Sequence, residues 1–173
     1  MPERSARQAA VEALRLTPPE ELMERMGELR AAAEKAGLTG REVERILNAR
    51  PDLPRPLLPS ERNMLSAVLG HGDYPGRDQL LAQLDSTYVT SYCGCGCAAV
   101  TLQVQGDVPP AACEQIPGAT IVDEDGDSIG SVDLMVDGDG YLCNVELSWW
   151  YVPICPLPPP DRLRWEEPRY STW

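Results

Sequence analysis

Three cysteines within five residues are the group in this 173-residue chain whose types and spacing are best suited to chemistry. They are Cys93, Cys95 and Cys97, in the run CGCGC. Thiolate sulfur is a preferred ligand of zinc and of Cu(I), so the run suggests a metal site or a thiol-redox site. On an extended strand alternate residues lie about 6.6 Å apart, too far for three bonds of about 2.3 Å to one ion. We therefore expect metal binding only if Gly94 and Gly96 fold the run into a turn.

A fourth zinc ligand would have to come from elsewhere in the sequence. The sequence contains no second cysteine pair with zinc-finger spacing to supply it. Free cysteine is also among the most buried residue types, so the thiols would equally suit the apolar side of a hairpin. We favour this metal-free interpretation and keep zinc as the cofactor to test. The candidates for the fourth ligand are the remaining cysteines and the single histidine: Cys113, Cys143, Cys155 and His71.

The other motifs that could carry chemistry fail on spacing. A calcium loop that began at Asp123 would need glycine at its sixth position and glutamate at its twelfth, but Ser128 and Leu134 stand there. The sequence has no G-x-S-x-G element and no glycine-rich phosphate loop. We predict no catalytic residue, and an unrecognised hydrolase or modifying enzyme is the weakest of our hypotheses.

The distribution of charge is the strongest hint at a partner. The chain has 15 Lys and Arg against 27 Asp and Glu, a formal net charge of −12. Residues 78–161 contain neither lysine nor arginine. This balance argues against nucleic-acid binding, whereas a field of one sign attracts a partner of the opposite sign. We therefore predict a basic protein partner, no membrane contact because no apolar run approaches about 20 residues, and a cytoplasmic location because the N-terminus lacks a signal peptide's apolar region.

Specific side chains are expected to bind that partner. Acidic residues in a turn and on a strand would attract it, and two adjacent tryptophans would anchor it, because tryptophan is enriched among interface hot spots. The predicted residues are Asp123, Asp125, Asp127, Asp133, Trp149 and Trp150.

Composition divides the chain into parts. The first 73 residues contain no tyrosine, tryptophan or cysteine, and four prolines fall within 51–59. We predict a helical N-terminal extension over 1–50, a proline-rich linker over 51–59, an α+β domain over 60–164 and an aromatic tail over 165–173. Capping boxes at Thr17–Glu20 and Thr39–Glu42 predict the starts of two helices in the extension. Such thin helices need a partner surface, and a homodimer through them is one option.

Alternating apolar and polar residues predict strands in the second part. The alternation covers 100–104, 132–136 and 141–149, with Val145 and Cys143 among the residues expected to face inward. The sequence DGDG between the last two runs is typical of a hairpin turn. Two short helical patterns precede these strands. The predicted fold class is α+β, with an antiparallel sheet of about five strands and helices on one face.

Three runs in this part resemble a widespread family of small, acidic, uncharacterised bacterial proteins common in actinobacteria: YPGRDQLLAQLDSTYVTSYCGCGCAAVTLQV, VDLMVDGDGYLCNVELSWW and CPLPPPDRLRW. The resemblance covers roughly residues 60–164. Tyr74 stands where that family usually has phenylalanine, and Ala98 where it usually has proline. The shared motifs imply a cysteine-rich hairpin and a related fold, and no activity.

Two functional hypotheses follow. The first is a non-enzymatic acidic protein of the immunity or antitoxin kind, which captures a basic protein. The second is a metal-binding or thiol-redox protein centred on Cys93, Cys95 and Cys97.

Overall fold

A computed structural model describes residues 2–113 and 116–165 of the chain. This part folds into five α-helices and one antiparallel sheet of seven strands. The α+β class and the helical N-terminus are confirmed, but the sheet is larger than the five strands expected. Two of its strands, β1 (Arg55–Pro56) and β7 (Leu163–Arg164), have two residues each. Alternation cannot reveal strands of this length, which is why they escaped prediction.

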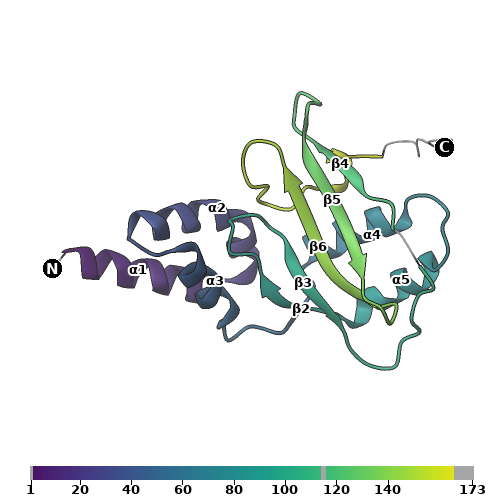
Figure 1. Ribbon diagram of the computed structural model, residues 1–173, viewed down its shortest axis with the longest axis horizontal. Coiled ribbons are helices and arrows are strands. Elements are labelled where there is room, and N and C mark those ends of the chain that lie inside the picture. Colours follow the sequence, from purple (N-terminus) through teal and green to yellow (C-terminus); the bar gives the residue numbers. More distant parts are fainter. Residues whose placement is uncertain (1, 114–115, 166–173) are drawn as a thin grey trace.

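Three N-terminal helices pack together at one end of the molecule (Figure 1). They are α1 (Pro2–Leu16), α2 (Pro19–Lys35) and α3 (Gly40–Asn48). None of the helices among the described residues is both long enough and apolar enough to cross a membrane.

The two predicted capping boxes have different outcomes. At the start of α3, Glu42 N donates to the Thr39 side chain, and the Glu42 carboxylate accepts from Thr39 N at 2.8 Å, as predicted. The box predicted at Thr17 is wrong, because α2 has Pro18 as its N-cap. The Thr17 hydroxyl instead donates at 2.6 Å to Ala13 O in the last turn of α1, a carbonyl that also accepts from Thr17 N.

The sheet lies beside the N-terminal helices, with two further helices behind it (Figure 1). Its strand order is β1-β2-β3-β6-β5-β4-β7, so β3 pairs with β6 and the chain between β3 and β4 crosses to the far side. The helices are α4 (Pro59–Gly70) and α5 (Arg77–Gln83), and the remaining strands are β2 (Thr87–Tyr92), β3 (Val100–Val104), β4 (Ala119–Val122), β5 (Ser128–Val136) and β6 (Leu142–Trp149).

Burial along the strands follows the predicted alternation with one exception. In β5, Val132 is buried and Asp133 is exposed, and in β6 Val145 is buried, as expected. Near the turn between β5 and β6, however, Leu142 is buried while Cys143 is only partly buried. The register between the two strands shifts at this end of the pairing, which changes the residue that faces the core.

Residues 51–59, the predicted linker, contain β1, which pairs with β2. Arg55 in β1 is buried and forms a bidentate ion pair with Glu61 of α4, with N–O distances of 2.8 and 2.7 Å. Its Nε donates to the Tyr92 hydroxyl at 2.9 Å. Buried apolar side chains of α2 and of the sheet belong to one hydrophobic cluster. Whether residues 1–50 can be separated from the rest stays a prediction to be tested.

Candidate functional site

The three cysteines lie in the turn that joins β2 to β3, and the turn brings their sulfur atoms together. The Sγ atoms of Cys93 and Cys95 are 3.0 Å apart, and those of Cys95 and Cys97 are 2.8 Å apart. All three lie within 4.8 Å of one another. Gly96 has φ +95°, a conformation that glycine adopts without steric cost. The convergence that metal binding requires is therefore present.

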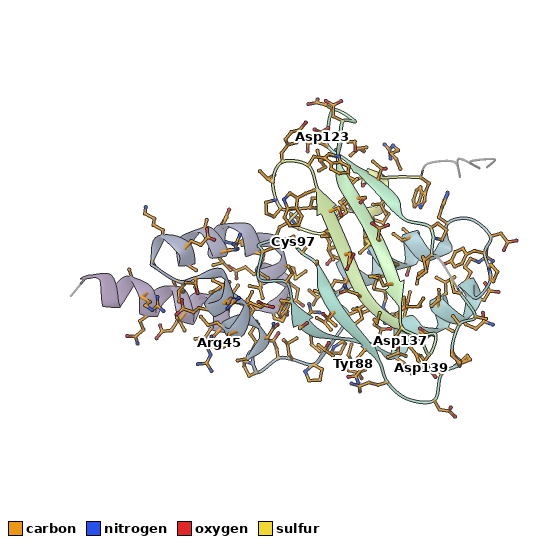
Figure 2. The ribbon with its side chains drawn as sticks, viewed as in Figure 1. Arg45, Tyr88, Cys97, Asp123, Asp137 and Asp139 are labelled. Carbon is orange, nitrogen blue, oxygen red and sulfur yellow. The ribbon has the colours of Figure 1, made fainter. Side chains whose placement is uncertain are left out.

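Helix α2 holds one side of this turn. Arg30 Nη1 donates to Cys95 O at 2.6 Å, and a Cβ at Gly96 would lie 3.0 Å from Arg30 Cδ. Cys97 is located where the N-terminal helices meet the sheet (Figure 2). The guanidinium of Arg30 thus brings a positive charge to the thiol cluster from a residue 65 positions earlier in the sequence.

Helix α3 holds the other side. A Cβ on Gly94 would lie 2.6 Å from the Cβ of Glu44 and 3.1 Å from its Cα, so only glycine fits against this helix. One turn further along α3, the Asn48 side-chain oxygen accepts a hydrogen bond from Tyr92 N at 2.9 Å. These contacts fix the start of the cysteine turn relative to α3.

The three thiols of the cluster differ in pKa. Hydrogen bonds from the thiols of Cys95 and Cys97 stabilise a thiolate on Cys93 and hold its pKa far below the usual value, and the charge of Arg30 acts in the same direction. The same hydrogen bonds raise the pKa of Cys95 and of Cys97, because these two keep the shared protons. Cys93 is therefore the thiol of this cluster that loses its proton most readily.

The thiols open into a cleft of about 410 Å³ on the sheet surface. Its lining includes two carboxylates, Glu44 and Glu146, and two amides, Asn48 and Asn144. These residues come from α3 and β6, and sequence analysis did not select them because neither segment is near the cysteines in the chain. Carboxylates beside thiolates give the cleft a negative field that favours cations.

None of the four predicted fourth ligands belongs, among the described residues, to the group of ligand atoms within 4.8 Å. His71 stacks on Trp165, with ring centroids 4.1 Å apart. Cys155 Sγ donates to Met23 O at 3.0 Å. Of the predicted aromatic tail, only Trp165 is among the described residues.

Four of the six residues predicted to bind a partner lie together. Asp123, Asp125 and Asp127 occupy the turn between β4 and β5, where the Asp123 carboxylate accepts from Asp125 N at 3.0 Å and from Asp127 N at 2.9 Å. Trp150 lies beside them, exposed, and its indole N–H donates to Ser128 Oγ at 3.1 Å. Asp123 therefore shapes the turn, while the other two carboxylates are free to meet a partner.

The other two predicted residues lie apart from this turn. Asp133 is exposed on β5 directly opposite Glu146 of β6, so two like charges face each other across the strands. Trp149 is partly buried and pairs with Gly130.

No family model, curated protein or solved structure matches this chain. Function is therefore inferred from the geometry of the thiol cluster and of the surfaces near it.

Proposed function

We propose that the protein binds one soft metal ion, Cu(I) or Zn²⁺, through the thiolates of Cys93, Cys95 and Cys97. The observation that carries this proposal is the convergence of three sulfur atoms within 4.8 Å at the mouth of a cleft. Thiolates are the ligands that distinguish these ions from hard cations such as Mg²⁺ and Ca²⁺.

The spacing of the sulfur atoms suits an ion between them. An ion about 2.3 Å from each sulfur, with angles between tetrahedral and trigonal, requires sulfur–sulfur distances of about 3.8–4.0 Å. The adjacent pairs here are 3.0 and 2.8 Å apart, and no pair exceeds 4.8 Å. To hold the ion, the sulfur atoms of the two adjacent pairs would have to move apart by about 1 Å, a displacement that rotation of the cysteine side chains can supply.

The surroundings favour the charged form that a metal needs. Deprotonating three thiols builds up negative charge, which Arg30 and the incoming cation both offset. Cu(I) is satisfied by three thiolates, whereas zinc keeps a fourth position for a ligand from the cleft.

Metal titration of the reduced, full-length protein tests the proposal. Zn²⁺ or Cu(I) is added without oxygen and in the presence of a chelator of known affinity, and bound metal is measured by elemental analysis after dialysis. We expect one ion per chain in the wild type, and loss of that ion in Cys95→Ser. The matched control is Cys143→Ser, which removes a partly buried thiol of β6 outside the cluster and should leave loading unchanged.

Two outcomes would contradict the metal site. One is a folded, reduced wild type that retains neither ion. The other is metal that stays in Cys95→Ser but leaves in Cys143→Ser. In the first case the cluster would be either inert or a redox centre, and the remaining test would be whether mild oxidation joins two of its thiols.

We also propose capture of a basic protein, as immunity and antitoxin proteins do, because the acidic β4–β5 turn adjoins the exposed Trp150. Binding of polylysine measures the electrostatic part. Its association rate should fall steeply between 0.1 M and 1 M salt, since the Debye length shortens from about 10 Å to about 3 Å. An association rate that does not respond to salt would leave the acidic surface with no role in capture.

A further inference from the structure

An apolar groove of about 340 Å³ lies next to the acidic β4–β5 turn, at the opposite end of β4 and β5 from Asp137 and Asp139 (Figure 2). One wall is formed by the end of β4 with Ile121 and Val122, and the other by the irregular segment 151–159. The volume falls within the range of about 300–1,000 Å³ that is usual for ligand sites.

The outer wall of the groove exposes large apolar side chains to solvent. Tyr151 is 87% exposed and Val152 is 70% exposed, and the neighbouring Trp150 is 56% exposed. Consecutive exposed side chains of this kind are rare on a surface without a binding role and mark an interaction site. The floor of the groove is formed by Ile154 and Leu157, whose side chains are buried in the hydrophobic core.

Charge at the rim determines what the groove can hold. Asp123 and Glu124 line it, and Asp125 and Asp127 follow in the same turn. Among the described residues that line the groove, Arg162 is the one cation, and it pairs with Glu124 at 3.3 Å. An apolar ligand with positive charge at one end matches this arrangement, whereas an acidic ligand would be repelled.

We propose that this groove binds an extended peptide segment of a protein partner, in which apolar side chains adjoin lysine or arginine. The proposal rests on the capture of a basic protein and specifies where that capture occurs. Apolar side chains fill the groove between Val122 and Val152, and the adjoining basic residue meets the carboxylates of the turn.

Fluorescence anisotropy with a labelled peptide of three leucines between two pairs of lysines tests the proposal on the full-length protein. We expect binding at micromolar concentrations. Replacing the lysines with glutamates, or the leucines with serines, should abolish it. In the protein, the double change Tyr151→Ser with Val152→Ser should weaken binding about ten-fold. The Val152 change alone removes about two methyl groups that the bound peptide would cover.

The charge at the rim has its own matched pair of variants. Asp125→Asn with Asp127→Asn should weaken binding about three-fold at low salt. Asp107→Asn with Asp139→Asn removes the same charge from exposed positions outside the groove and should have a smaller effect. All these side chains are exposed, so circular dichroism should show that each variant is folded.

The outcomes separate this proposal from those above. Equal affinity for the glutamate peptide, no binding up to 1 mM, or affinity unchanged by the Tyr151 and Val152 changes would overturn the groove as the site. If polylysine still binds in a salt-dependent manner in that case, capture of basic proteins stands without the groove. Metal loading should be the same in all groove variants, because the cysteine cluster lines a different cleft.

Discussion

Replacing Gly94 with alanine tests whether the cysteine turn is packed against α3 as the structure has it. The added Cβ would lie 2.6 Å from Glu44 Cβ, 3.1 Å from its Cα and 3.2 Å from its N. Carbon atoms in favourable contact are about 3.5–4.0 Å apart, so the turn and the helix must separate by about 1 Å. Two of the three atoms belong to the backbone, which cannot move aside as the end of a side chain does. Overpacking of this kind costs about 1–3 kcal/mol.

Urea unfolding of the full-length protein gives the measurement. With a slope of about 2 kcal/mol per molar urea, the midpoint of Gly94→Ala should fall by about 0.5–1.5 M. The matched control is Gly70→Ala at the end of α4, where an added Cβ meets no atom within 4 Å and the backbone is not left-handed. That variant should be as stable as the wild type or slightly more so, since alanine favours helix more than glycine does.

A midpoint for Gly94→Ala equal to that of the control would refute the docking of α3 on the turn. It would instead favour the division predicted at residues 51–59, with the N-terminal helices as a separate unit. If the docking is correct, the same variant should also weaken metal loading, because the turn that brings the thiols together is displaced.

Three further changes test other contacts. Glu61→Leu should cost about 3–5 kcal/mol in unfolding free energy, because it leaves the guanidinium of Arg55 buried without its partner. Gln83→Leu should cost about 2–3 kcal/mol, because two backbone groups of the β5–β6 turn, Gly140 O and Leu142 N, and one of the segment after β3, Pro109 O, lose their hydrogen bonds to its side chain. A loss under 1 kcal/mol in either variant would contradict these contacts. Hydrogen bonds from the Thr39 backbone and hydroxyl lower the pKa of Glu42 to about 2. In the unfolded chain the pKa of a glutamate is about 4.3, so the stability that Glu42 adds is complete above pH 4.3 and is lost as the pH falls toward 2. The difference in unfolding free energy between wild type and Glu42→Gln should therefore shrink over that pH range. A difference that stays constant would rule out the cap as its source.

The predictable parts of the fold are those in which a long element buries one face. Val132 and Val145 follow the period of two because one side of β5 and β6 faces the core. The Thr39 cap was predictable because both partners are local, only three residues apart. Thr17 misled the prediction because a hydroxyl at the junction of two helices can either donate to a carbonyl of the helix before it or accept from an N–H of the helix after it. The sequence does not say which of the two hydrogen bonds forms.

The parts that were missed depend on contacts between distant residues. β1 and β7 exist because the sheet offers backbone partners at its edges, not because their own residues favour strand. The pairing of β3 with β6 brings Asn144 and Glu146 beside the cysteines, and no local pattern shows which strand will be that neighbour.

The run CGCGC illustrates how much of a site is encoded by residues that do no chemistry. Cysteine at every second position indicated a possible ligand set, but the spacing alone would keep the thiols apart on a strand. Gly96 turns the chain through a left-handed conformation, and Gly94 lets the backbone of α3 approach to a distance that any side chain would prevent. Each glycine therefore has its own structural reason, one conformational and one steric. Because the steric reason depends on α3, the thiol cluster and the packing of the N-terminal helices should be gained or lost together.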